Sequence, residues 1–209
     1  HTINIDTKNL NGEFVTAKGT VKIYKLKAPN SVLRQRPWAA PDYQKLSEEA
    51  FKDLFPHDAY KDEHNAANWD KGDLVFEKDF NTEKSKALEL GKIKKWESGQ
   101  YLITLESKDK FGQLVKDEIK TTLYSADDDT VADNQLFNIS SNKPTYKSGE
   151  TAILTLASAA ENLNVTVYIE KERKIIKTHI IQLSNNKKTI SVPVEAKDLG
   201  GFVVHYSFA

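Results

Sequence analysis

The sequence predicts an all-β fold of two tandem antiparallel β-sandwiches, the first carrying a helix-containing insertion. Short stretches that alternate apolar and polar residues recur at regular spacing in the last third of the chain, as sandwich strands do. Asn, Pro and Gly, which favour turns, separate these stretches. The 209 residues suffice for two small domains with their own cores. We expect a first module over 1–126, an acidic linker over 127–134 and a second module over 135–209.

Four strands are expected in the first module. They cover residues 20–26, 74–80, 99–105 and 118–124. The turn Asn11-Gly12 precedes the first of them, and a turn at 109–112 separates the last two. The period of two places Tyr101, Ile103 and Leu105 on one face of their strand, which indicates a face turned toward a core.

A long interruption at about 28–72 separates the first two strands and is expected to be an ordered insertion, because structureless loops of this length are uncommon. Part of it has apolar residues at helical spacing, with Phe51 and Phe55 beside them: Tyr43, Leu46, Ala50 and Leu54. Asp42 is the expected N-cap of this helix and Pro56 its end. Trp38 and Trp69 are expected to pin the helix to the sheet.

Beyond the acidic linker, six stretches predict strands. They are 136–140, 151–156, 165–170, 174–183, 189–194 and 201–208. Tyr146 lies in the turn before the second of them, where its hydroxyl can bond backbone. Pro193 indicates an edge strand. Because seven strands are typical of such sandwiches, we expect one more after Ala209, and an open edge without it.

Composition excludes several classes of function. Lys plus Arg equals Asp plus Glu at 30 each, which argues against a nucleic-acid or anionic-membrane surface. The chain has no Cys, so disulfides, thiolate metal sites and cysteine nucleophiles are excluded. It has no Met either, and we expect it to be cut from a longer chain. No apolar run is long enough for a membrane span, and none is typical of a signal peptide.

Several motifs of the second half resemble a macroglobulin-type domain, the immunoglobulin-like sandwich repeated in alpha-2-macroglobulins. They are Leu136-Phe-Asn-Ile, Asn142-Lys-Pro-Thr-Tyr-Lys-Ser-Gly-Glu150 and the alternating strand to Ala157. The first half resembles a neighbouring module of the bacterial, Bacteroidetes-like members. Its motifs are Leu10-Asn-Gly-Glu-Phe-Val-Thr-Ala-Lys-Gly-Thr-Val-Lys-Ile-Tyr, Arg36-Pro-Trp, Phe55-Pro, Tyr60, Trp69-Asp-Lys-Gly72, Ser98-Gly-Gln-Tyr-Leu and Asp109-Lys-Phe-Gly112.

The resemblance implies a structural piece of a protease-trapping protein of the cell envelope, periplasmic or surface-exposed. In that family the sandwiches form a shell around a bait segment and a reactive thioester. The thioester needs a Cys, which this sequence lacks, so no inhibitory residue is transferred to it. The expected partners are other domains of the same longer chain and, for the whole protein, proteases. The alternative is a surface adhesin or glycan-binding module; an enzyme has no support, since neither a nucleophile elbow nor a phosphate loop occurs.

Three charged clusters contain residue types that bind metals or catalyse hydrolysis, and a solvated role is expected for each. His57 and His64, with Asp58, Asp62 and Glu63 between them, have the only metal-like spacing, but Pro56 predicts a loop there. Asp127, Asp128, Asp129 and Asp133 could bind calcium or form a hydrated hinge, and the EF-hand pattern is absent. Glu48 and Glu49 beside Asp53 could serve glycoside hydrolysis, but the predicted helix places them on its polar face. We expect no catalytic residue, cofactor or metal.

Exposed aromatic residues could stack on sugars, whereas buried ones anchor a core or the insertion. The residues concerned are Trp38, Trp69, Trp96 and Tyr43, and the anchoring role is expected for them. Asn138-Ile-Ser140 and Asn164-Val-Thr166 match glycosylation acceptors, a pattern that is frequent by chance.

Overall fold

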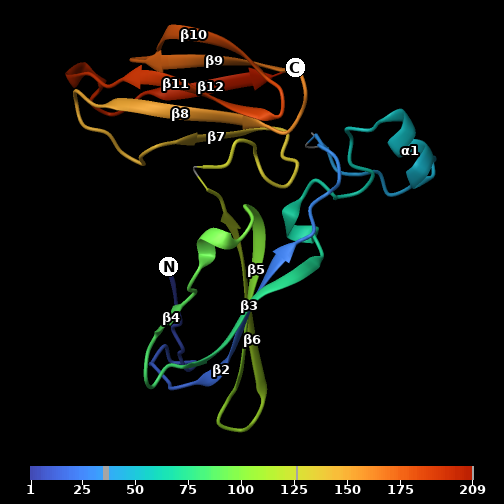
Figure 1. The fold of residues 1–209 in the computed structure, drawn as a ribbon, viewed down its shortest axis with the longest axis vertical. Helices are drawn as coiled ribbons and strands as arrows, with labels where there is room; N and C mark the ends of the chain where they lie inside the picture. The colour runs from blue at the N-terminus through green and yellow to red at the C-terminus, as the bar shows by residue number, and fades with distance from the viewer. Residues whose placement is uncertain (35–37, 126, 209) are drawn as a thin grey trace. The chain divides into compact units, whose positions relative to one another are not determined.

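The computed structural model describes residues 1–34, 38–125 and 127–208 (Figure 1). Outside these ranges lie Arg36 and Pro37 of the matched motif, the expected module boundary at 126, and Ala209. Contacts divide the described residues into two compact units, one of 1–28 with 65–125 and the other of 29–64 with 127–208. Antiparallel strands dominate both units and no barrel closes, which confirms the predicted all-β sandwich fold.

The first unit is built on a four-stranded antiparallel sheet in the order β3-β2-β5-β6. Its strands are β2 (Lys18–Leu26), β3 (Lys71–Asn81), β5 (Gly99–Lys108) and β6 (Leu114–Leu123). These are the four strands that the sequence predicts, each starting or ending a few residues further out. The predicted turn at 109–112 joins β5 and β6: the Gly112 N–H donates to the Asp109 carbonyl at 3.0 Å, and Gly112 has a φ of 79°, which favours glycine.

A two-stranded sheet that the sequence did not predict covers part of this larger sheet. Its strands, β1 (Thr2–Asn4) and β4 (Ala87–Glu89), have three residues each, too few for a readable alternation. The side chains buried between the two layers are Ile5, Val21, Ile23, Phe80, Leu88 and Tyr101. Ile103 and Leu105 pack against this cluster, so the predicted common face of Tyr101, Ile103 and Leu105 is confirmed.

The second unit contains a sandwich of two three-stranded antiparallel sheets, in the orders β11-β8-β7 and β10-β9-β12. The strands are β7 (Asn138–Ser141), β8 (Thr151–Ser158), β9 (Leu163–Lys171), β10 (Lys174–Leu183), β11 (Asn186–Pro193) and β12 (Val203–Phe208). They are the six predicted strands, and Pro193 does end an edge strand. The buried core lies between the sheets: Ala152, Leu154, Leu156, Leu163, Val165, Val167, Ile169, Leu183, Ile190 and Val192.

The turn before β8 is fixed by a small network around Tyr146. The Tyr146 hydroxyl accepts the Lys143 backbone N–H at 3.1 Å and donates to Asn142 Oδ1 at 2.6 Å. Asn142 Oδ1 also accepts the Ile153 N–H at 2.9 Å, which ties the turn to the strand that follows. The predicted bond between the Tyr146 hydroxyl and the backbone is therefore confirmed.

The helix of the insertion is shorter than the spacing predicts. α1 (Glu48–Leu54) is capped by Ser47, whose Oγ accepts the Ala50 N–H at 3.2 Å, so the predicted Asp42 cap is wrong. Ser47 is the N-cap because it directly precedes a first turn with two glutamates, which the helix dipole favours. Pro56 follows the C-cap as predicted. Three short 3-10 helices complete the described elements: η1 (Ala66–Asn68), η2 (Ile93–Lys95) and η3 (Ala196–Asp198).

Aromatic contacts inside the insertion, and not Trp38, hold α1. Phe51 packs against Phe55 and Tyr60, with ring centroids 5.2 and 5.4 Å apart. The Tyr60 hydroxyl donates to the Leu46 carbonyl at 2.9 Å. Trp38 is 74% exposed, so the predicted pinning of the helix by this residue is wrong.

Candidate functional site

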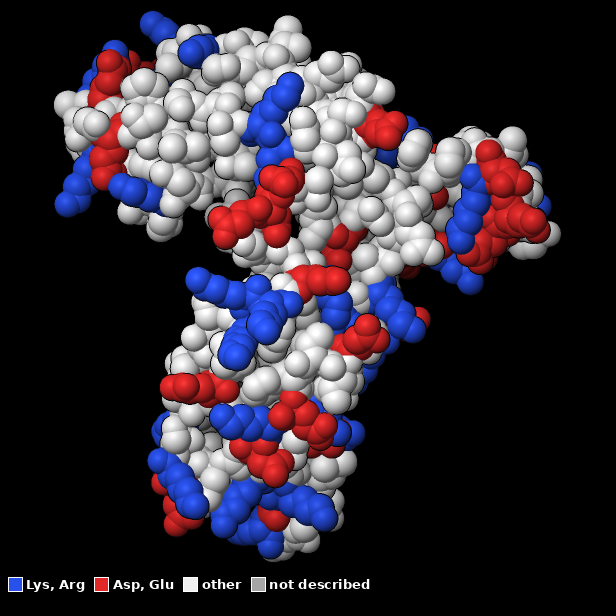
Figure 2. Space-filling model, viewed as in Figure 1, with Lys and Arg blue, Asp and Glu red and all other residues white. Residues whose placement is uncertain are grey.

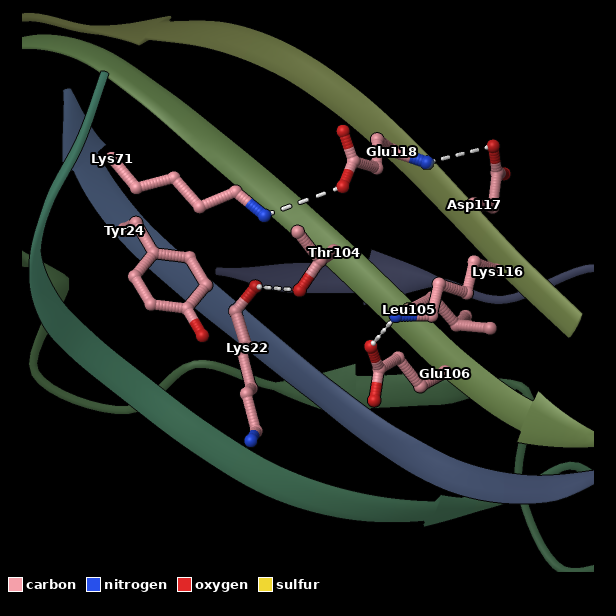
Figure 3. Close-up of a pocket in the computed structure, with 9 residues that line it drawn as sticks. All are labelled: Lys22, Tyr24, Lys71, Thr104, Leu105, Glu106, Lys116, Asp117 and Glu118. Atoms are coloured by element: carbon pink, nitrogen blue, oxygen red, sulfur yellow. Dashed lines mark hydrogen bonds and ion pairs between the residues drawn. The ribbon is translucent and has the colours of Figure 1, made fainter. Parts of the chain in front are cut away.

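A shallow pocket lies on the face of the four-stranded sheet that points away from the core of the first unit (Figure 3). Its volume of about 80 Å³ is far below the several hundred Å³ that enclose a small ligand. Residues from all four strands line it: Lys22, Tyr24, Lys71, Thr104, Leu105, Glu106, Lys116, Asp117 and Glu118. The strand pleat puts these charges here, because the alternate residues of the same strands fill the core.

Cross-strand ion pairs neutralise the charges around this pocket. Lys116 Nζ lies 2.7 Å from Glu106, and Lys71 Nζ lies 3.4 Å from Glu118. The hydrogen bond from Lys116 lowers the pKa of Glu106, and the same bond raises the pKa of Lys116. Lys71 also lies over the Tyr24 ring, with Nζ 5.5 Å from its centroid.

The charged side chains that line this pocket bond one another. Lys116 and Lys71 are engaged by the carboxylates of Glu106 and Glu118, so neither amine is presented alone as a nucleophile or base. The arrangement is an ordinary solvated sheet face with complementary charges, and no chemistry is assigned to it.

The predicted histidine cluster lies in a loop, as Pro56 indicated. His57 is exposed, and its Nδ1 lies 3.2 Å from the Val32 carbonyl. His64 is half-buried, and its Nδ1 is buried without a hydrogen-bond partner. In the ranges that the structure describes, no three His, Cys, Asp or Glu side chains group closely enough to hold a metal ion.

The carboxylates of α1 face solvent, as predicted. Glu48 pairs with Lys52 one turn later at 2.5 Å, and Glu49 and Asp53 are exposed. The bond from Lys52 lowers the pKa of Glu48. These groups support the helix and do not flank a cleft.

The acidic linker is bonded to the start of the insertion. Asp133 and Asn134 adopt left-handed backbone conformations, with φ of 58° and 50°. The Asn134 side chain donates to the Pro29 carbonyl at 2.8 Å, so the linker and the start of the insertion are joined within the second unit. Asp129 is exposed, whereas Asp128 and Asp133 are half-buried.

The aromatic candidates divide into two classes. Trp96 is half-buried between Phe76 and Tyr101, with ring centroids 6.2 and 5.8 Å away, as expected of a core anchor. Trp38 and Tyr43 are 74% and 79% exposed, so their predicted anchoring role is wrong. Trp69 is half-buried at the end of η1. Sequence alone could not separate the classes, because no alternation surrounds Trp38 or Tyr43.

A buried ion pair in the second unit escaped the sequence analysis. Lys171 Nζ contacts Asp198 Oδ2 and also donates to the Pro193 carbonyl at 2.8 Å. Both residues are buried, and the Glu195 N–H donates to the same carboxylate oxygen at 2.8 Å. The pKa of Asp198 is lowered, first by this backbone bond and then by Lys171. The pair fixes η3 against the end of β9, and its only sequence signal is a lysine at an inward position of an alternating strand.

The molecular surface carries charges of both signs. Figure 2 shows lysines and arginines interspersed with acidic residues on the visible face of both units, without a large patch of one sign. Among the described residues, no helix combines the length and the apolar character that crossing a bilayer requires. No protein-family model, curated protein or solved structure matches the chain.

Proposed function

We propose that this chain is a structural scaffold piece of an alpha-2-macroglobulin-like protease inhibitor, made of macroglobulin-type sandwich modules. The observation that carries the proposal is the turn from Asn142 to Glu150, the most characteristic motif of the resemblance. This turn folds as a bonded corner at the start of β8: Tyr146 bonds Lys143 and Asn142, and Glu150 Oε2 accepts the Lys147 N–H at 2.9 Å. The proposed location of the whole protein is the cell envelope, periplasmic or surface-exposed.

The proposed mechanism is conformational. Cleavage of a bait segment elsewhere in the protein would move the surrounding modules, and modules with rigid cores transmit such movement as bodies. The core of the second unit and its buried Lys171–Asp198 pair are suited to this role, because packed interiors resist deformation. The proposed partners are other domains of the longer chain and, for the whole protein, proteases.

The test uses the full product of the gene that encodes this chain. A protease enclosed in a shell still cleaves small peptides but is shielded from large protein substrates. We expect the full product to suppress trypsin cleavage of a large protein while cleavage of a short chromogenic peptide continues. Equal suppression of both substrates, or of neither, would overturn the proposal. The 209-residue chain alone is expected to suppress neither.

A second candidate, a glycan-binding surface module, is favoured by the exposed Trp38 and Tyr43. Exposed aromatic rings can stack on sugar faces, and both lie in the insertion, within ten residues of α1. Titration of the chain with soluble polysaccharides, followed by tryptophan fluorescence, tests this function. Saturable quenching that Trp38→Ala abolishes would support it, whereas an unchanged spectrum would exclude it for those sugars.

A further inference from the structure

We infer that β6 is a self-pairing edge, through which two copies of this chain join by antiparallel β6–β6 contact around a two-fold axis at Ile119. β6 pairs with β5 on one side only, and its register with β5 is regular over all ten residues. Nine of its ten residues are exposed. A long, regular edge strand is a template for another strand. This inference does not depend on the proposed function.

The hydrogen bonds of the β5–β6 hairpin determine which backbone groups of β6 are open. The Asp109 N–H donates to the Gln113 carbonyl at 2.9 Å. Because hydrogen-bonded positions alternate along an antiparallel pair, the backbone N–H and C=O groups of the odd-numbered residues of β6 point toward β5. The Glu118 N–H, by contrast, is taken by the neighbouring Asp117 Oδ1 at 2.9 Å, as expected of a group without a strand partner. The even-numbered residues therefore direct their N–H and C=O groups toward an incoming strand, and the Glu118 N–H would exchange Asp117 Oδ1 for a carbonyl of that strand.

Charge selects one register among those that this parity allows. A two-fold axis at Asp117 sets Glu118 opposite Lys116 but also sets two aspartates opposite each other. An axis at Glu118 sets two glutamates opposite each other and Lys116 opposite Lys120. An axis at Ile119 instead places Glu118 of each copy opposite Lys120 of the other. Opposite charges across a strand pair stabilise it and like charges destabilise it. The Ile119 register is thus favoured because it combines two symmetric Glu–Lys pairs with no like charges directly opposite each other.

The same register also joins apolar side chains on the core-facing side of β6. Ile119 is 59% exposed and Val115 is 49% exposed, because the two-stranded cover does not enclose them. With the axis at Ile119, the two Ile119 side chains face each other and Val115 faces Leu123. Ile119 occupies a non-hydrogen-bonded position, where side chains of opposite strands are closest. Pairing would therefore bury the most exposed apolar residues on this side of the strand.

The present partners of the two charged residues are weak and exchangeable. Glu118 bonds Lys71 at 3.4 Å, with both side chains about half exposed. Lys120 Nζ donates to the carbonyls of Ala66 and Ala67. Exposed pairs of this kind contribute little to stability, so exchanging them for partners in a second copy has a small cost.

The other long edges of the described residues carry features that block pairing. β11 contains Lys187 and Lys188 and ends at Pro193. β10 has a bulge between Ile175 and Lys177, and the pairing of β3 with β2 is shifted twice. Bulges, lysines and prolines discourage strand addition. β6 has neither a bulge nor a proline, and of its two lysines Lys120 becomes the partner of Glu118 in the proposed register.

Single-cysteine cross-linking tests the register, since the chain has no cysteine of its own. Ile119→Cys places two thiols opposite each other, and oxidation should give a disulfide-linked dimer. Val115→Cys is the matched control on the same strand and face, because its thiols would lie about 26 Å apart along the strands. Leu10→Cys controls for exposure, since Leu10 is fully exposed in a loop. If the rate of disulfide formation instead follows the exposure of each cysteine, with Leu10→Cys fastest, the proposed register is wrong.

Sedimentation of the cysteine-free chain tests the charges. We expect reversible association that Glu118→Lys weakens by about tenfold, because both pairs then become repulsive. The double variant Glu118→Lys with Lys120→Glu restores the pairs in reversed order and should restore association. A chain that stays monomeric at high concentration, or a dimer indifferent to both variants, would contradict the inference.

Discussion

The two units enclose their cores differently, although their strands alternate alike. In the second unit, two three-stranded sheets face each other, and inward residues of β9 such as Val165 and Val167 are fully buried. In the first unit, the cover of the four-stranded sheet is a pair of three-residue strands. Inward residues of β6 such as Ile119 consequently stay exposed. Alternation fixes which face a side chain takes, whereas the opposite layer decides whether that face is buried.

The largest effects are expected from truncation in the two cores. Leu156→Ala in the second unit and Ile23→Ala in the first each remove a side chain that is at most 1% exposed. Each should lower the free energy of unfolding by about 2–5 kcal/mol, from lost burial and the cavity left behind. Urea unfolding followed by NMR signals of each unit measures the effect. If the units are independent, each substitution shifts only its own signals; a shift of both would show that they unfold together.

Truncation of an apolar side chain that no second layer covers should have a much smaller effect than truncation in the cores. Ile119→Ala in β6 should change the free energy of unfolding of a dilute sample by less than about 0.5 kcal/mol, because its side chain is already exposed. Calorimetry at low concentration measures this change. A loss as large as that of Ile23→Ala would mean that β6 is covered in solution.

Removal of the buried ion pair should rank next. Lys171→Met leaves the Asp198 carboxylate buried, with the Glu195 N–H as the remaining donor to Oδ2. We expect Tm to fall by more than about 5 °C. Lys116→Met, which breaks the exposed pair with Glu106, is the matched control and should leave Tm nearly unchanged. Equal effects of the two variants would contradict the structural role of the buried pair.

The Tyr146 corner is expected to have a smaller effect. Tyr146→Phe keeps the ring and removes the hydroxyl that bonds Lys143 and Asn142. The loss should be about 1 kcal/mol in the free energy of unfolding, measured by urea titration. Faster amide exchange of Ile153, whose N–H is held by Asn142, should accompany it. Unchanged exchange at Ile153 would mean that the hydroxyl does not order the corner.

A pH effect localised in the second unit should be the smallest. Burial, and secondarily Lys177, lowers the pKa of His179 below its ordinary 6.5, and its Nε2 is buried without a partner. The unfolded state therefore binds the proton more readily. Stability is fully present above about pH 6.5 and is lost as the pH falls from there toward the lower pKa of the folded state. Urea midpoints between pH 7 and 5 should fall less for His179→Phe than for the original chain.

Strands were predictable where a long alternation of apolar and polar residues exists. The short strands, the helix cap, the aromatic anchors and the buried ion pair depend on tertiary context. All six strands of the second sandwich and the four of the larger first sheet were predicted, since each spans several periods. β1 and β4 were not, because three residues cannot show a period. Asp42 lost the helix cap to Ser47, and Trp38 is exposed, because caps and anchors depend on neighbours that the pattern does not specify. The Lys171–Asp198 pair joins residues 27 positions apart and has no local signature.

Sequencing of the encoding gene on both sides of His1 and Ala209 tests the central claim most directly. The scaffold account predicts further sandwich modules, a bait-like segment and a thioester cysteine with a nearby glutamine. A reading frame that ends near Ala209, or one that carries a sugar-active or cell-wall-anchoring domain, would contradict it and favour the glycan-binding module.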